Sequence, residues 1–153
     1  MKTALITGGT KGIGKAIALE FLKHGYEVAL NYNSDEQAAL ATQEEFNMQG
    51  YCSVLMPADV SDPAQVKNMF DEFFGIYEKL DVLVNNAGIS LVRVIQDTTP
   101  SDWDRVFDVN VKGAFNCCRS AVDKMIGNGG GSIINVSSIW GEVGASCEVA
   151  YSA

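Results

Sequence analysis

A glycine-rich segment near the start of the chain has residue types and spacing that suit phosphate binding. It runs from Thr7 to Gly14, contains the spacing G-x3-G-x-G, and follows the apolar run Ala4–Ile6. Glycine permits a tight turn and lets a phosphate approach the backbone amides, since a Cβ would block both. A helix expected over residues 13–24 would point its positive N-terminal end at the same place. The segment predicts a dinucleotide site; the alternative is a glycine-rich turn that binds nothing.

A second group of small and polar residues, Asn85 to Gly88, follows another apolar run. In an open parallel sheet, ligands bind at the carboxyl ends of the strands, where the strand order reverses. Small residues there would let a cofactor ring pass close to the backbone. The alternative is a turn that only ends a strand. Together, the two segments predict a cofactor cleft at this edge of the sheet.

Apolar runs and helical patterns alternate along the chain, which predicts the α/β class. We expect strands over residues 3–7, 27–31, 52–56, 82–85 and 132–137, and helices over residues 13–24, 35–48, 63–77 and 101–125. Val82-Leu83-Val84 and Ile133-Ile134 are continuous apolar runs, which are typical of strands covered on both faces. Strand–helix repetition with short loops predicts a parallel, right-handed, doubly wound sheet. No repeat or linker divides the chain, so we expect residues 1–153 to form one domain.

Local signals support the helix boundaries. Gly25 stands where a left-handed residue would end the first helix. Asp62-Pro63 reads as an N-cap followed by proline at the first helical position, and residues 100–102 begin the long helix in a similar way. The glycines of residues 127–131 predict a loop ahead of the fifth strand, because no helix follows them.

The composition argues against several classes of partner. There are 11 basic and 19 acidic residues, and the net charge of -8 disfavours nucleic acid or an anionic membrane surface. No segment approaches the roughly 18 apolar residues of a membrane span, so we expect a cytoplasmic protein. The single histidine and the ungrouped cysteines predict no metal site. We expect buried, reduced thiols at Cys52, Cys117, Cys118 and Cys147.

The two glycine-containing segments, with Asp59-Val60, Asn110, Ser138 and Tyr151, resemble the short-chain dehydrogenase/reductase family in order and spacing along the whole chain. The resemblance implies a Rossmann-type, three-layer α/β/α fold, of which these residues would form the first five strands of seven. It implies that the glycine loop holds the pyrophosphate, Asp59 and Val60 meet the adenine, and residues 86–88 line the adenosine side. The cofactor-binding residues would be Thr7, Gly8, Thr10, Lys11, Gly12, Ile13, Gly14, Asn33, Ser34, Asp59, Val60, Asn86, Ala87 and Gly88.

The resemblance also implies that Asn110, Ser138 and Tyr151 are catalytic. When hydride adds to a carbonyl carbon, the oxygen gains negative charge, which Ser138 would stabilise and Tyr151 would protonate. Ser137 is the adjacent alternative to Ser138. Asn110 could instead satisfy the backbone at a helix kink.

A phenol with a pKa near 10 needs nearby positive charge to act at neutral pH. The family supplies a lysine four residues after the tyrosine, a position beyond Ala153. We therefore expect residues 1–153 to be the first part of a longer chain and to be inactive alone. The alternative is a naturally shortened binding protein.

The end of the second strand favours NADP(H) over NAD(H). An NAD enzyme usually has a carboxylate there, which binds the ribose 2′-hydroxyl. Residues 30–34 contain no acid, whereas Asp35 and Glu36 come later and suit a helix N-terminus. Lys11 would reach a 2′-phosphate, as a basic residue there does in NADP-preferring members of the family, with added hydrogen bonds from Asn33 and Ser34. The alternative for Lys11 is a solvated loop charge.

The expected substrate is a small-molecule or carrier-bound carbonyl. The chain resembles bacterial 3-oxoacyl-[acyl-carrier-protein] reductases. Residues 137–141 with 144–149 are also similar to the elongation factor P 5-aminopentanone reductases, which reduce a carbonyl on a modified lysine. Trp140 would contact substrate or pack within the wall of the pocket.

Two classes other than an enzyme remain open. One is a dinucleotide-binding module without catalysis, and the other is an interaction fragment. The family implies a homo-oligomer, a tetramer or dimer, in which the long helices near residues 101–125 pack together.

Overall fold

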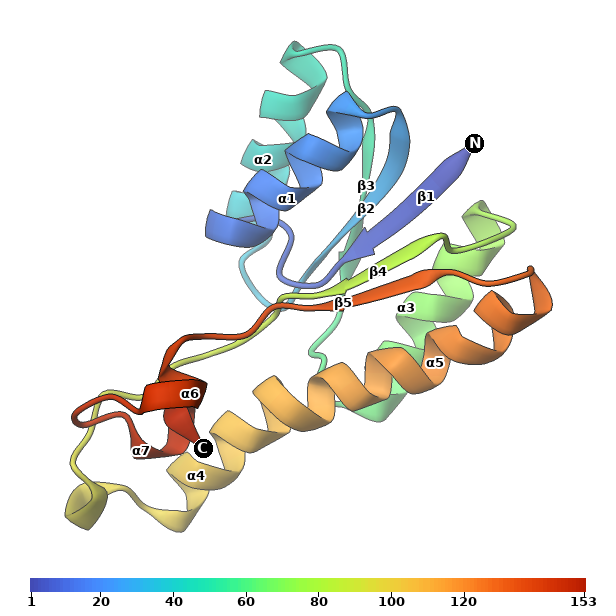
Figure 1. Ribbon diagram of the computed structural model, residues 1–153. Helices are drawn as coiled ribbons and strands as arrows, with labels where there is room; N and C mark the ends of the chain where they lie inside the picture. The colour runs from blue at the N-terminus through green and yellow to red at the C-terminus, as the bar shows by residue number, and fades with distance from the viewer.

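A computed structural model describes all 153 residues, from Met1 to Ala153. Its centre is one five-stranded sheet in the order β3-β2-β1-β4-β5, with every neighbouring pair parallel (Figure 1). Helices α1 and α2 lie on one face of the sheet, and α3 and α5 lie on the other. The strands are β1 (Lys2–Ile6), β2 (Tyr26–Tyr32), β3 (Ser53–Pro57), β4 (Val82–Asn85) and β5 (Ser132–Asn135). This order confirms the doubly wound, three-layer fold, with the strand order reversing at β1.

The helices are α1 (Gly12–Lys23), α2 (Glu36–Met48), α3 (Pro63–Ile76), α4 (Pro100–Phe107), α5 (Gly113–Gly127), α6 (Trp140–Val143) and α7 (Val149–Ser152), with a 3₁₀ turn at Ile95–Asp97. Helices α1, α2 and α3 begin and end close to the predicted positions, whereas the short helices α6 and α7 were not predicted. Asp62 caps α3 through the amides of Ala64 and Gln65, and Gly25 has a φ of +76° after α1, as predicted. No helix combines the length and apolar character that crossing a membrane requires.

The long helix predicted over residues 101–125 is interrupted. A capping box between Thr99 and Asp102 starts α4, and the helix then passes through a π-helical turn at Asp108–Lys112 before α5 begins. A π turn inserts one residue into the helical repeat and is frequent at functional sites. The interruption places Asn110 on the turn itself.

Successive side chains along the central strands point to opposite faces of the sheet and therefore belong to two separate cores. Leu5, Ala29 and Leu83 belong to the core beneath α3 and α5, whereas Ile6 and Val84 belong to the core beneath α1 and α2. All five are completely buried. Burial on both faces explains why these strands are continuous apolar runs. Truncating Leu5, Ile6 or Leu83 to alanine would lower the free energy of unfolding by about 2–5 kcal/mol, so the two cores stabilise the sheet that positions the site.

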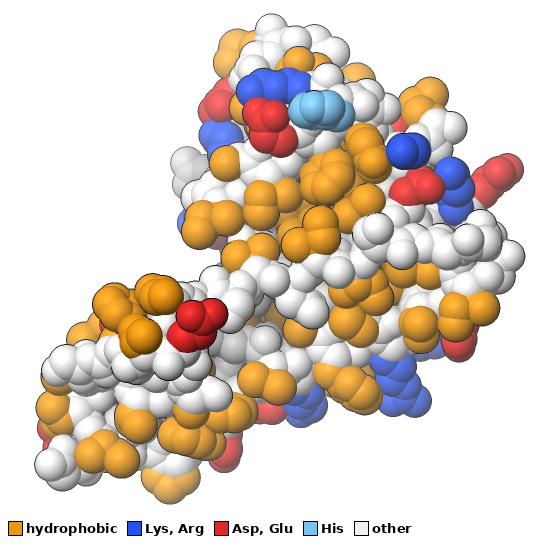
Figure 2. All heavy atoms as spheres, viewed as in Figure 1, with side chains coloured by type: hydrophobic (Ala, Val, Ile, Leu, Met, Phe, Trp, Pro, Cys, Tyr) orange, Lys and Arg blue, Asp and Glu red, His pale blue; other side chains and the backbone are white.

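The fifth strand departs from the prediction in two ways. It ends at Asn135 and not at residue 137, because its only partner, β4, ends at Asn85. Ile133 and Ile134 are 39% and 44% exposed, so the prediction that this strand is covered on both faces is wrong for residues 1–153. The reason is position: β5 is the edge strand, and the α1 layer leaves its face of the sheet open there (Figure 1). Ile133, in register with Leu83, faces the α5 layer and is exposed as well. Figure 2 shows apolar side chains gathered over this open face.

Candidate functional site

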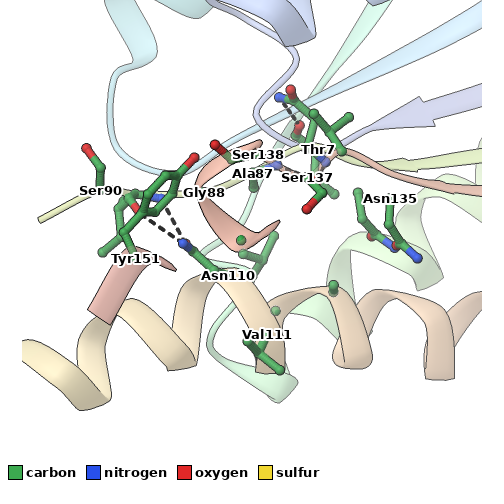
Figure 3. A pocket seen from close by; sticks show the side chains of 18 of the residues that line it. Thr7, Ala87, Gly88, Ser90, Asn110, Val111, Asn135, Ser137, Ser138 and Tyr151 are labelled. Atoms are coloured by element: carbon green, nitrogen blue, oxygen red, sulfur yellow. Dashed lines mark hydrogen bonds between the residues drawn. The ribbon is translucent and has the colours of Figure 1, made fainter. Parts of the chain in front are cut away.

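A cleft of about 440 Å³ opens at the carboxyl ends of β1, β4 and β5, where the strand order reverses (Figure 3). Thr7 and Ile13 line it from the glycine loop, and Asn110 lines it from the π turn. Its remaining walls come from the segments after β4 and β5 and from α7. The lining residues include Asn86, Ala87, Gly88, Ser137, Ser138 and Tyr151. The cleft thus brings together both predicted cofactor segments and all three residues implied as catalytic.

Hydrogen bonds join the glycine loop to the segment after β4. The Thr7 hydroxyl accepts hydrogen bonds from the amides of Asn86 and Ala87, at 2.9 and 3.0 Å, and donates to the Val84 carbonyl at 3.3 Å. The Asn86 side-chain amide donates to the carbonyls of Thr7 and Gly8, at 2.9 and 3.2 Å. Asn86 therefore holds the loop by its side chain, and the two segments form one rigid unit.

The glycines of the loop are required by geometry. Gly8 has a φ of +61° and Gly12 has a φ of +49°, where side chains are strained. A Cβ on Gly14 would lie 2.5 Å from Asn86 Nδ2 and still closer to the Gly8 carbonyl oxygen. The N-cap position of α1 is Lys11, whose side chain makes no capping hydrogen bond. No side chain caps the backbone amides in the first turn of α1. These amides are therefore free to bind a pyrophosphate.

Asn31, at the end of β2, also supports the loop. Its Oδ1 accepts from the Gly8 amide at 3.3 Å, and its Nδ2 donates to the carbonyls of Met56 and Ala58 at 3.1 and 3.0 Å. The side chain is 2% exposed. Sequence reasoning did not assign it a role, although an asparagine directly after Val28–Leu30 is a detectable signal, because a buried amide needs partners.

Asp59 is the centre of a polar cluster at the second implied cofactor region. Its carboxylate accepts from the Ser61 amide and hydroxyl at 2.9 and 2.6 Å, from Arg105 Nη2 at 3.3 Å and from Asn33 Nδ2 at 3.4 Å. Burial raises the pKa of this carboxyl, but the hydrogen bonds from Ser61 and the charge of Arg105 outweigh it, so the net shift is downward. The cluster ties the ends of β2 and β3 to α4.

Val60 is held from beneath by the helix that follows the π turn. Asn116 Nδ2 donates to the Val60 carbonyl at 3.0 Å, and a Cβ on Gly113 would lie 2.6 Å from Val60 Cγ2. Asn116 is 6% exposed. The roles of Arg105, Gly113 and Asn116 were missed by sequence reasoning; only Asn116, a polar residue on the buried face of its helix, offered a signal.

Asn110 projects from the π turn toward the segment after β4. Its Nδ2 donates to the Ile89 carbonyl at 2.9 Å, and its Oδ1 accepts from the Ile89 amide at 2.8 Å (Figure 3). The alternative interpretation is that Asn110 satisfies the backbone at a helix kink. The helix is distorted at Asn110, but the Asn110 side chain bonds Ile89 in the neighbouring loop and not the backbone of the helix. The kink and the cleft-lining position thus occur at the same residue.

Ser138 and Tyr151 reach the cleft from the segment after β5. Ser138 is half-buried and its hydroxyl accepts from the Trp140 amide at 3.2 Å, whereas Ser137 is exposed. Tyr151 lies on α7 and is half-buried, and in Figure 3 its ring lies at the Gly88 and Asn110 end of the cleft. Both serines line the cleft, so proximity alone does not choose between them.

Lys11 is not a free charge. Its ammonium group pairs with the Asp35 carboxylate. This hydrogen bond, and a second from the Ala38 amide, lower the pKa of Asp35. Asp35 is the N-cap of α2, as the sequence predicted. Asn33 and Ser34, on the same loop, are exposed.

The cysteines follow the prediction only in part. All four are free thiols, but Cys52 and Cys147 are exposed, so the prediction that all four are buried is wrong. Both stand outside the packed layers, Cys52 just before β3 and Cys147 in the loop before α7. Cys117 is buried on α5, and burial raises its pKa to about 12. Cys118 is half-buried, with its Sγ 3.3 Å from Asn85 Nδ2.

An open parallel sheet with a glycine loop at its switch point defines a Rossmann-type α/β protein. The family model for short chain dehydrogenase matches residues 2–153. The chain belongs to this family.

Individual relatives agree with this assignment. The 3-oxoacyl-[acyl-carrier-protein] reductase FabG of Staphylococcus aureus is 43% identical over 143 residues, covering 94% of this chain and 58% of that protein. The short-chain type dehydrogenase/reductase of Picea abies is 37% identical over 145 residues, covering 90% and 54%. The uncharacterized oxidoreductase YgfF of Escherichia coli K12 is 40% identical over 152 residues, covering 97% and 62%. The chain thus spans less than two thirds of the length of each of these relatives.

Proposed function

We propose that the protein containing these residues is an NADP(H)-dependent reductase that converts a carbonyl to a hydroxyl. The observation that carries the proposal is the convergence of the glycine loop, Asn110, Ser138 and Tyr151 on one cleft. The substrate class is a 3-oxoacyl group on an acyl carrier protein. Its support is the 43% identity to the Staphylococcus aureus reductase that carries this name.

The cradle of residues 7–14 would hold the pyrophosphate through backbone amides, while Asp59 and Val60 would meet the adenine and residues 86–88 would line the adenosine side. Gly8, Gly12 and Gly14 fit this task because a side chain would fill the cradle or strain the turn. When bound, the nicotinamide supplies the hydride. Lys11, with Asn33 and Ser34 beside it, would select a 2′-phosphate, which favours NADP(H) over NAD(H).

Each catalytic residue would act on the substrate oxygen or on the shape of the cleft. Ser138 would donate a hydrogen bond to the carbonyl oxygen, and Tyr151 would transfer its hydroxyl proton to that oxygen as charge develops there. Asn110 holds the backbone of Ile89 and so fixes the wall beside Tyr151. Tyr151 would thus deliver the proton beside a wall that hydrogen bonds hold in place.

We also infer that residues 1–153 alone bind the dinucleotide without reducing a carbonyl. Tyr151 needs a cationic neighbour, and every lysine is engaged elsewhere. Lys11, Lys15, Lys23, Lys67, Lys79 and Lys112 pair with carboxylates, and Lys2 and Lys124 lie over aromatic rings.

The proposed partner besides the substrate is a second copy of the protein. Val111, Phe115 and Ile126 are 57%, 60% and 71% exposed along the π turn and α5. Their spacing places them on one face of the helix, and an apolar stripe of this kind supports a homo-oligomer.

The test uses the complete protein. We expect it to oxidise NADPH only when a 3-oxoacyl carrier substrate is added. Tyr151→Phe and Ser138→Ala should each lower kcat about 100-fold or more, while the NADPH Kd from calorimetry changes less than about threefold. Ser137→Ala is the matched control and should keep most of the activity. NADPH binding without turnover of this substrate would contradict the proposal, as would equal losses in the two serine variants.

A further inference from the structure

The pair between Lys11 and Asp35 bridges two elements of the proposed cofactor site. Lys11 precedes α1 at the glycine loop, and Asp35 precedes α2 after the end of β2. The two side chains are 60% and 50% exposed, so a ligand can reach both. Each oxygen of the carboxylate has its own partner: Oδ1 accepts from the Ala38 amide at 3.0 Å and Oδ2 accepts from Lys11. The helix cap therefore fixes the carboxylate where it meets the lysine.

We propose that Asp35 is a specificity-determining residue, which competes with the 2′-phosphate of NADP(H) for Lys11 and so weakens the preference for NADP(H) over NAD(H). The inference rests on the proposed function, because it concerns how strongly that cofactor is selected. Asp35 would make no bond to the ribose. It would affect NADP(H) binding by engaging Lys11, which would otherwise bind the 2′-phosphate.

The competition follows from the charges. An ion pair between two exposed side chains is weak, so a phosphate carrying about two negative charges can take the lysine from the carboxylate. The carboxylate cannot leave with it, because the Ala38 amide continues to hold it at the start of α2. A fixed negative charge then remains close to the phosphate. NAD(H) has no phosphate at this position and escapes that repulsion.

Other charged residues also lie around this point. Lys15, one turn further along α1, pairs with Glu45 of α2 at 2.6 Å. Glu36 is exposed in the first turn of α2. Arg105 also lies at this loop, but it pairs with Asp59, which Asn33 contacts as well. Lys11 is the cation that pairs with Asp35.

Asp35→Asn tests the proposal with little disturbance, because asparagine is as good an N-cap as aspartate. In the complete protein, calorimetry should show NADPH binding about three- to tenfold tighter, as expected for removing one charge at this range in a solvent-exposed site. The Kd for NADH should change less than about twofold. The control is Asp71→Asn, which removes the acidic partner of Lys67 on α3, a pair whose side chains are 72% and 63% exposed. It should leave both Kd values unchanged.

A second background separates competition for Lys11 from direct repulsion. In Lys11→Gln, the tightening caused by Asp35→Asn should shrink to the part that direct repulsion contributes, because no lysine is left to release. Persistence of the full gain in that background would overturn the proposal. So would an unchanged NADPH Kd in Asp35→Asn alone, or weaker NADH binding, which would instead make Asp35 a ribose ligand. A wild-type protein that binds neither dinucleotide would overturn the proposed function itself.

Discussion

Asn110 bonds both backbone polar groups of Ile89, its Nδ2 donating to the carbonyl at 2.9 Å and its Oδ1 accepting from the amide at 2.8 Å. One side chain thereby replaces the hydrogen bonds that a neighbouring strand would supply. The residue can do this because the π turn carries it toward the segment after β4. The pairing joins the π turn to the cleft wall. The interruption of the helix therefore positions the side chain that holds this wall.

Asn110→Ala should lower the free energy of unfolding by about 1–3 kcal/mol, because it leaves two polar groups of half-buried Ile89 unpaired. Asn110→Asp should be similarly destabilising, since a carboxylate can accept from the Ile89 amide but cannot donate to its carbonyl. Urea unfolding measures both. Asn128→Ala is the control: it removes a side chain–backbone bond to Glu78 at 3.3 Å in an exposed loop and should cost less than about 0.5 kcal/mol. Equal losses at Asn110 and Asn128 would contradict this account.

Gly14→Ala should abolish tight dinucleotide binding and destabilise the fold by about 1–3 kcal/mol. The added methyl group would overlap the Gly8 carbonyl and lie 2.5 Å from Asn86 Nδ2, in a unit that is rigidly bonded. The measurements are calorimetric titration with NADPH and the thermal unfolding midpoint.

Gly75→Ala provides the matched control. Gly75 lies in α3 and a Cβ there meets nothing within 4 Å, so alanine should stabilise the helix by up to about 1 kcal/mol and leave NADPH binding unchanged. If Gly14→Ala behaved like Gly75→Ala, the glycine cradle would not be required for binding.

Asp59 should make the fold sensitive to acid. Its folded-state pKa is lowered from 3.8, because the bonds from Ser61 and Arg105 outweigh the opposing effect of burial. A lowered pKa contributes stability that is present above the unfolded value and lost as the pH falls through the folded value. Arg105→Met should therefore destabilise the protein at pH 7, and this difference should shrink below about pH 4.

The control for this prediction is the same change in an Asp59→Asn background. There, Arg105→Met should have an effect that no longer depends on pH in the acid range, as measured by unfolding free energies. A pH-dependent effect that persisted without the Asp59 carboxyl would assign the acid sensitivity to another group.

Strands and helices were predictable because their signals are local. The apolar runs of β1 and β4, the Asp62 cap of α3 and the left-handed Gly25 each reflect the preferences of a few consecutive residues. The exposed β5 was not predictable from its own residues. The residue types of Ile133 and Ile134 predicted burial, and only the order of the strands shows that they lie on the exposed edge strand.

The sequence by itself predicted the α/β fold and the glycine loop, because chain order and residue type suffice for these, and its family resemblance pointed to Asn110, Ser138 and Tyr151, which line the cleft. The tertiary structure alone decided what those residues touch: Asn86 bonds the glycine loop, Asn110 bonds Ile89, and Lys11 pairs with Asp35. The partners are 79, 21 and 24 residues apart in the sequence, in that order. Hydrogen bonds and charge pairs act over a few ångströms, so only the packing of the layers determines which partners meet.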